Sequence, residues 1–128
     1  PFYNRYAPMV HEAGKLYLCH VDGFVRGIEH LIARCDLDVI EALTPRPMGD
    51  ISISEALEAW PDKAVWCNFP ESVLLEDDSA VRAATVDLLE QGQARGRFVL
   101  GIVENYPEER MEGGLGAITE AVAAFPSD

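Results

Sequence analysis

The sequence predicts an α/β protein built from four parallel βα units, which is half of a TIM (β/α)8 barrel. Four short runs of β-branched or aromatic residues alternate with segments of helical spacing, and this order is typical of a parallel sheet. The chain has 128 residues, 48% of them hydrophobic, so we expect one core and a single domain over residues 1–128. Eight such units close a barrel of about 250 residues.

The expected elements follow one another regularly along the chain. The expected strands cover residues 16–21, 38–43, 64–69 and 98–103. Ser52 and Glu55 form a capping box before the helix that follows the second strand. Apolar residues at helical spacing lie before the first strand and after each of the four: Phe2, Tyr6, Met9 and Val10; Ile28, Leu31, Ile32 and Cys35; Ala56, Leu57 and Trp60; Val81, Ala84 and Leu88; Leu115, Ile118 and Val122.

Charge and composition exclude several functions. The net charge is −12 and the ten Lys and Arg residues form no basic run, so nucleic acids and anionic membrane surfaces are not expected partners. We find no signal peptide and no apolar stretch of membrane-spanning length, which favours a cytoplasmic protein, although a removed N-terminal portion could have carried such a signal. Cys19, Cys35 and Cys67 form no CxxC pair and are expected to be free buried thiols.

Polar residues gather where the expected strands end. His20 and Asp22 lie two positions apart in an extended segment, so their side chains point to the same side, about 6 to 7 Å apart along the strand. Two good metal ligands are thereby aimed at one point. Glu41, Asn68 and Glu104 lie at the ends of the other three strands. Because ligands bind beyond the carboxyl ends of parallel strands, these residues are candidates for a small-molecule site.

From Gly14 through the Asn68-Phe69-Pro70 segment to the final helix, the chain resembles the C-terminal half of the uroporphyrinogen decarboxylase superfamily, which includes the cobalamin-dependent methyltransferases. Those methyltransferases carry His-x-Cys-Gly at the first of these strands and another Cys after the last. Together these residues bind a zinc ion that activates a thiol.

This chain keeps part of that motif. His20 and Gly23 match the family His and Gly, Asp22 replaces the first Cys, and Glu104 falls near the second. The resemblance therefore implies a metal site made of His20, Asp22 and Glu104, with oxygen ligands in place of sulfur. Such a set suits zinc and also other first-row divalent ions such as Fe(II), Mn or Co.

The function that the resemblance implies is metal-assisted methyl transfer of the corrinoid-dependent type. The metal would act as a Lewis acid on an oxygen or thiol group of the substrate, and a corrinoid or corrinoid protein would supply the methyl group. Asn68 and Glu41 would orient the substrate, and Glu41 could also act as a general base.

Two other functions stay open. The decarboxylases of the superfamily need no metal or cofactor, and the resemblance places one of their active-site His residues near Glu104. Metal-free decarboxylation of an acidic, porphyrinogen-like substrate is therefore one alternative, although the substrate-binding Arg and Asp of those enzymes lie in the N-terminal half that this chain lacks. The other alternative is a half barrel without catalysis of its own, which serves as an assembly module.

Each candidate residue also has a structural interpretation. A neighbouring carboxylate could hold His20 and fix its tautomer, and Glu104 could simply face water. Asn68 could stabilise the turn before Pro70. Asp50, in the Pro- and Gly-rich connector after the second strand, is expected only to help start the next helix.

The remaining conspicuous side chains are assigned to structure. Trp60, Trp66 and Phe69 are expected to fill the core, and we assign no chemistry to His11 and His30. A lone half barrel would leave two open strand edges and an uncovered interior face. We therefore expect a homodimer or pairing with an N-terminal half barrel.

Overall fold

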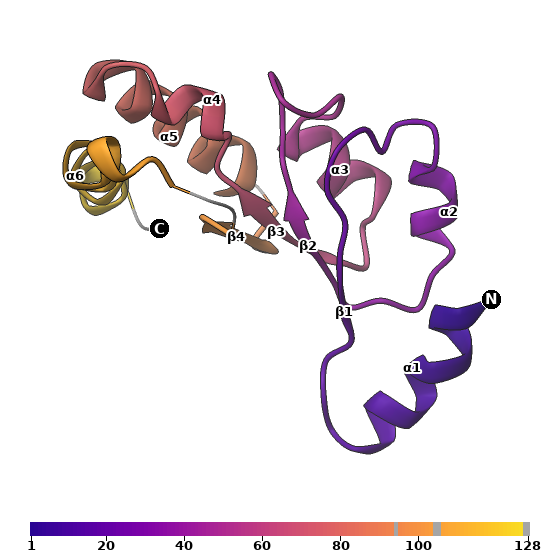
Figure 1. The fold of residues 1–128 in the computed structure, drawn as a ribbon. Coiled ribbons are helices and arrows are strands. Elements are labelled where there is room, and N and C mark those ends of the chain that lie inside the picture. Colours follow the sequence, from indigo (N-terminus) through magenta and orange to yellow (C-terminus); the bar gives the residue numbers. More distant parts are fainter. Residues whose placement is uncertain (94, 104–105, 127–128) are drawn as a thin grey trace.

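The computed structural model describes residues 1–93, 95–103 and 106–126 and confirms the α/β architecture. Four strands form one parallel sheet in the order β1-β2-β3-β4: Leu18–His20, Val39–Leu43, Ala64–Asn68 and Phe98–Gly101. Each strand pairs with the next one in the sequence, as a segment of a (β/α)8 barrel requires. The sheet formed by the described residues is open, and β1 and β4 are its edges (Figure 1).

Helices connect the strands at the places where helical spacing predicts them, and two short elements were not predicted. The unpredicted elements are α4 and the 3-10 helix η1. The bounds are α1 Phe2–Glu12, α2 Glu29–Ala33, α3 Ile53–Ala59, α4 Glu71–Leu74, α5 Asp78–Gln93, η1 Glu108–Arg110 and α6 Met111–Ala124. The predicted capping box is confirmed, because Ser52 Oγ accepts a hydrogen bond from the backbone N–H of Glu55 and the Glu55 carboxylate accepts one from Ser52 N–H.

The core lies between one face of the sheet and the helices α3 and α5 that run beside it (Figure 1). Ile40, Val65 and Cys67 point to this side and have no exposed surface. Trp60 and Phe69 are also fully buried, as predicted. Each large apolar side chain buried here stabilises the fold by about 1.5 to 3 kcal/mol relative to its exposed state.

The other face of the sheet is more exposed, and we call it the open face. It carries the alternate strand residues Leu18, Val39, Trp66 and Val99, and both Leu18 and Val99 are 46% exposed. The Trp66 side chain lies over Gly101 so closely that a Cβ atom there would come within 2.3 Å of Trp66 Nε1. Trp66 is therefore half-buried on this face, and the expectation that it fills the core is wrong.

Helix α1 is confirmed, but its apolar face is not buried among the described residues. Phe2 is 71% exposed and Met9 65% exposed, whereas Ala7 is buried. Polar contacts attach the helix to the flank of the sheet: Tyr3 Oη lies 3.0 Å from Cys19 Sγ, Asn4 Nδ2 donates to Arg34 O, and His11 Nε2 lies 2.8 Å from Asp38 Oδ2. Helical spacing alone could not show which face of α1 would meet the sheet.

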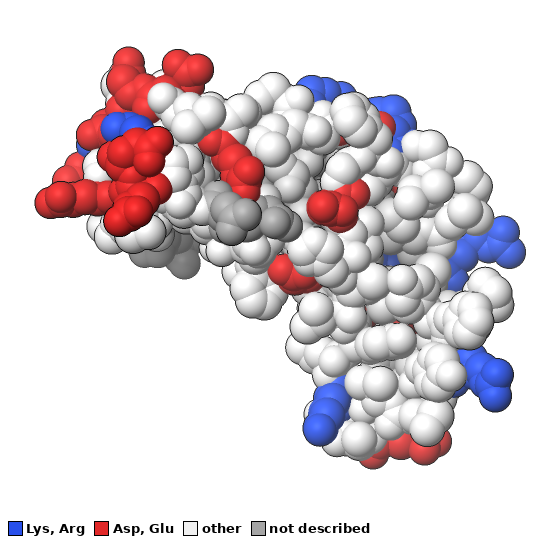
Figure 2. All heavy atoms as spheres, in the orientation of Figure 1, with Lys and Arg blue, Asp and Glu red and all other residues white. Residues whose placement is uncertain are grey.

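Acidic side chains gather at one end of the molecule, over the end of α4 and the starts of α5 and α6 (Figure 2). In the part of the chain that the structure describes, no helix is long and apolar enough to cross a membrane. Cys19, Cys35 and Cys67 are free thiols, as predicted, but only Cys67 is fully buried.

Candidate functional site

The first feature of the site is a direct contact between two predicted residues. His20 and Glu41 are paired opposite each other on β1 and β2, and His20 Nδ1 lies 2.8 Å from Glu41 Oε2. The Glu41 side chain is 14% exposed and the His20 side chain 52% exposed. A carboxylate that is largely removed from water needs a hydrogen-bond donor, and the imidazole of His20 provides one for Glu41.

A β-bulge in β2 directly follows Glu41. Ile40 pairs with Val65 and Leu43 pairs with Cys67, so β2 contains one more residue than β3 over this stretch. Ala42 takes up the irregularity with a φ of 63°, a left-handed conformation that costs a non-glycine residue about 1 to 2 kcal/mol. Bulges often lie next to functional sites, where they change the direction of side chains. This bulge lies between Ile40 and Leu43, so it includes Glu41 and Ala42.

Asn68 forms the second part of the site, at the carboxyl end of β3. It is 1% exposed, its Nδ2 donates to Thr44 Oγ1 at 3.1 Å, and its Oδ1 accepts from the backbone N–H of Val103 at 3.0 Å. The interpretation that Asn68 stabilises the turn before Pro70 is not supported by these partners. Asn68 instead joins the end of β2 to the segment after β4.

The predicted metal ligands are only partly within the described structure. Strand β1 ends at His20, and Asp22 is exposed in the segment beyond it, just before Gly23 at a φ of 75°. Glu104 lies outside the described residues. Within residues 1–93, 95–103 and 106–126, no group of three His, Cys, Asp or Glu side chains could hold a metal ion. Because the predicted set includes Glu104, it stays a prediction.

Asp50 was expected only to help start α3, and that expectation is wrong. Ser52 caps the helix, whereas Asp50 Oδ1 accepts hydrogen bonds from the backbone N–H groups of Val25 and Arg26 at 2.9 and 3.2 Å. The Arg26 guanidinium in turn donates to the Asp50 carbonyl oxygen at 3.0 Å. The loop after β1 is thereby bound to the loop after β2 by reciprocal hydrogen bonds.

Glu55 strengthens the same connection. Its carboxylate accepts hydrogen bonds from Ser52 N–H, from Arg26 at 2.8 Å and from Arg46 at 3.1 Å. The backbone N–H of Ser52, followed by the Arg26 guanidinium, lowers the pKa of Glu55 to about 2. Two arginines from two loops therefore converge on one ionised carboxylate at the start of α3.

The His20–Glu41 pair can orient an imidazole for chemistry. A carboxylate only accepts hydrogen bonds, so Glu41 favours the tautomer in which Nδ1 of His20 carries the hydrogen. Metal-ligating histidines typically have this arrangement, with a carboxylate on one ring nitrogen and the metal on the other. Histidines that transfer protons use it as well.

Comparisons with known proteins identify no family for this chain. A scan against protein-family models finds no match, and no curated protein matches the chain.

Several residues of the site were not found from the sequence. Thr44 was interpreted as part of a connector, Ala42 as an ordinary residue of the second strand, and Trp66 as a core residue. Trp66 Nε1 is buried without a hydrogen-bond partner among the described residues. Alignment of the expected strands could have placed Thr44 near Asn68, but only a structure shows the one-residue shift at the bulge.

Proposed function

We propose that this chain is one half of a barrel enzyme of the uroporphyrinogen decarboxylase superfamily and that its reaction is metal-assisted methyl transfer of the corrinoid-dependent type. The observation that carries the proposal is the contact between His20 Nδ1 and Glu41 Oε2 at the carboxyl edge of adjacent parallel strands. That edge is where α/β proteins bind their ligands.

In this proposal His20, Asp22 and Glu104 hold a divalent metal ion, zinc or another first-row ion. The carboxylate partner of His20 suits a metal-ligating imidazole, because it fixes the tautomer and the orientation of the ring. When bound, the ion supplies Lewis-acid activation of an oxygen or thiol group of a small-molecule substrate. A corrinoid, free or carried by a partner protein, supplies the methyl group.

Glu41 and Asn68 have different tasks in this proposal. Glu41 orients His20 through the 2.8 Å contact and is the candidate general base. Asn68 is a positioning residue, since both ends of its amide are engaged by Thr44 and Val103. It fixes the distance between the end of β2 and the segment after β4, which border the proposed substrate site.

Metal-free decarboxylation of an acidic, porphyrinogen-like substrate is the second candidate. The observation that favours it is the His20–Glu41 pair itself, which can deliver a proton to the carbon that loses carbon dioxide without any third ligand. A half barrel that only assembles with another half would need neither a proton donor nor a metal.

Elemental analysis of protein purified without chelator distinguishes these candidates. We expect about one ion per chain in the wild type, lost in His20→Ala and in Asp22→Ala. Glu12→Ala, which changes an exposed carboxylate on α1, is the matched control and should keep the ion. Wild-type protein that takes up no added zinc, manganese or cobalt would contradict metal-assisted transfer and leave the decarboxylase and the non-catalytic half barrel as candidates.

A further inference from the structure

Phe24 is the most exposed of the large hydrophobic residues that the structure describes, at 78%. It lies in the loop after β1, two residues beyond the predicted metal ligand Asp22. The next residue fixes the backbone here: Val25 is 1% exposed, belongs to the core, and donates its backbone N–H to Asp50 Oδ1 at 2.9 Å. An anchored backbone therefore holds the phenyl ring outside the core.

The loop that carries Phe24 lies directly against the loop after β2. A Cβ atom at Gly49 would overlap the carbonyl oxygen of Thr44 and would lie 3.4 Å from Gly23 O. Thr44 is in turn the hydrogen-bond partner of Asn68 at the end of β3. Gly23 and its neighbour Phe24 thus border the strand ends that carry the candidate site.

Met48 adds a second apolar side chain at this border. It directly precedes Gly49 and is 39% exposed. Its Sδ accepts a hydrogen bond from the backbone N–H of Ser72 at 3.4 Å, so the side chain extends from the loop after β2 to α4, just beyond β3. Phe24 and Met48 flank the contact between the two glycines, and we call these two side chains the apolar rim.

Polar groups accompany the apolar rim at the same edge of the sheet. His20 ends β1, and its side chain is 52% exposed. Asp22, between His20 and Phe24, is also exposed. Sites for small molecules combine apolar walls with a few polar groups that fix the orientation of the ligand. The carboxyl edge provides both kinds of group.

We propose that the apolar rim binds the aromatic ring of the substrate and that the substrate is a phenol, with its hydroxyl oxygen directed to the polar strand ends. A phenylalanine ring prefers to contact another aromatic ring, either stacked with an offset or edge to face. A methionine sulfur also contacts ring edges favourably. The inference rests on the proposed function, because it names the substrate class of the same site.

The size of the apolar rim favours a small molecule over a protein partner. A stable protein interface buries about 800 Å² on each partner and involves about 20 to 30 residues a side. The apolar rim consists of two side chains from two neighbouring loops. One aromatic ring matches this surface.

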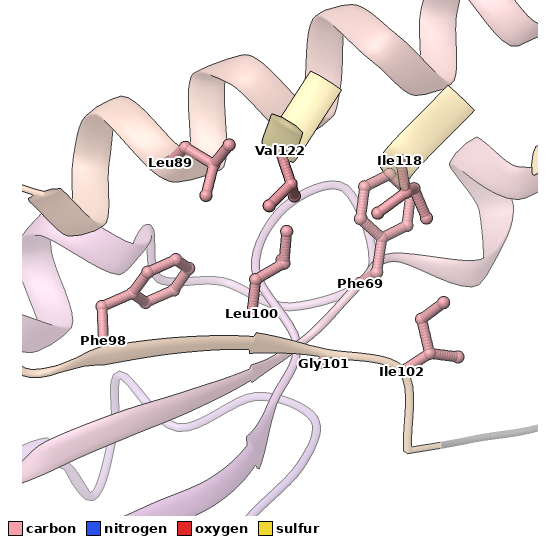
Figure 3. Close-up of a pocket in the computed structure, with 8 residues that line it drawn as sticks. All are labelled: Phe69, Leu89, Phe98, Leu100, Gly101, Ile102, Ile118 and Val122. Carbon is pink, nitrogen blue, oxygen red and sulfur yellow. The ribbon is translucent and has the colours of Figure 1, made fainter. Parts of the chain in front are cut away.

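A second apolar surface is the competing place for such a ring. Figure 3 shows Phe98 and Leu100 pointing from β4 into a cavity of about 430 Å³ that Leu89 of α5 and Val122 of α6 also line. None of the side chains that line this cavity can donate or accept a hydrogen bond. The cavity would hold a ring without orienting its hydroxyl group, so the test must distinguish the two places.

NMR titration of the isotope-labelled full chain with phenol and with cyclohexanol tests the proposal. The two probes have the same ring size and the same hydroxyl group, but only phenol is aromatic. We expect phenol to shift the amide signals of Gly23, Phe24 and Met48 and to bind about fivefold or more tightly than cyclohexanol. The amide signals of Phe98 and Leu100 report on the cavity and should stay unchanged.

Variants at exposed positions show whether the ring of Phe24 makes the contact. Phe24→Ala should weaken phenol binding by about fivefold or more, whereas Phe24→Tyr keeps an aromatic ring and should stay within about twofold of the wild type. Leu16→Ala is the matched control, because Leu16 is 73% exposed just before β1, at the opposite edge of the sheet. It should bind phenol like the wild type.

Four results would each overturn the proposal: no phenol binding, shifts confined to the β4 amides, equal binding by Phe24→Ala, or equal affinity for cyclohexanol. Metal content is measured separately, so the two proposals can fail independently. Phenol binding without metal uptake would contradict only metal-assisted transfer. Metal uptake without phenol binding would contradict only the role of the apolar rim.

Discussion

His20 and Glu41 are cross-strand partners whose side chains meet at 2.8 Å between Nδ1 and Oε2. The contact connects the edge strand β1 to β2 through side chains, in addition to the backbone ladder. Among the described residues of the predicted site, Glu41 is the least exposed carboxylate, with 14% of its side chain exposed, and His20 is the only imidazole. The contact brings these two groups together.

Glu41→Gln tests the chemical role of this contact. The amide keeps the shape of the side chain but removes the charge that favours hydrogen on Nδ1. We expect metal affinity to fall by about 10- to 100-fold with little change in the far-UV circular dichroism spectrum. Competition with a chromophoric chelator measures the affinity. Glu90→Gln, at an exposed position on α5, is the control, and equal affinity of both variants would contradict the role given to Glu41.

Substitutions at Ala42 test the strain at the bulge. Ala42→Val places a β-branched side chain at a φ of 63° and should destabilise the protein by more than about 2 kcal/mol. Ala42→Gly should change stability by less than about 1 kcal/mol, because relief of strain offsets the lost methyl group and the greater freedom of the unfolded chain. Urea unfolding measures both. Ala64→Val, at a half-buried position in β3, is the control and should be tolerated; a well-tolerated Ala42→Val would mean that the bulge rearranges easily.

Asn68→Ala tests the polar connection between the strand ends. The change leaves the Val103 N–H without its acceptor and removes the donor to Thr44 Oγ1, so we expect a loss of about 2 kcal/mol in the free energy of unfolding. Asn4→Ala removes hydrogen bonds to Arg34 and Asp36 at an exposed site and should cost less. Equal losses in the two variants would show that burial does not strengthen the Asn68 network.

Glu55 should contribute to the acid limb of the stability profile. Its folded pKa of about 2 lies below the ordinary value of 4.5, so its contribution is present above pH 4.5 and is lost as the pH falls toward 2. Glu55→Gln should therefore be less stable than the wild type at pH 7 and equal to it near pH 2. Arg26→Gln removes one donor but keeps the Ser52 N–H, so it should show a smaller difference over the same range. A constant difference from pH 7 to pH 2 would contradict this assignment.

The three thiols should differ in reactivity. Burial raises the pKa of Cys67 well above its ordinary value, and the thiolate is the reactive form. Cys19 and Cys35 are only half-buried. Mass spectrometry after iodoacetamide treatment should find these two modified first and Cys67 modified only in urea. Rapid modification of Cys67 in the folded protein would show that the core opens readily.

The strands and helices could be predicted more accurately from the sequence than the contacts between them. Alternating strands and helical segments predicted four parallel strands, each to within a few residues, because β-branched runs and helical spacing are local signals. The same spacing predicted α1 but not the exposure of Phe2 and Met9, since burial depends on what lies beside a helix. The capping box at Ser52 was correct because it needs only residues within one turn.

The sequence predicted which residues at the strand ends belong to the candidate site, but not the contacts between their side chains. His20, Glu41 and Asn68 were singled out, but the pairing of His20 with Glu41 depends on register between strands, which one sequence does not specify. Asp50 was misread because a carboxylate near a helix start resembles a cap, whereas its hydrogen bonds run to a loop 25 residues away.

The reciprocal bonds between Asp50 and the Val25–Arg26 backbone have a consequence for how such a site could diversify. In many barrels each loop can change length independently while the scaffold stays the same. Here a deletion in one loop would leave the hydrogen-bonding groups of the other loop without their partners, so the two segments can change only together. Grafting either loop alone into another scaffold should fail where a graft of both, with Glu55, succeeds.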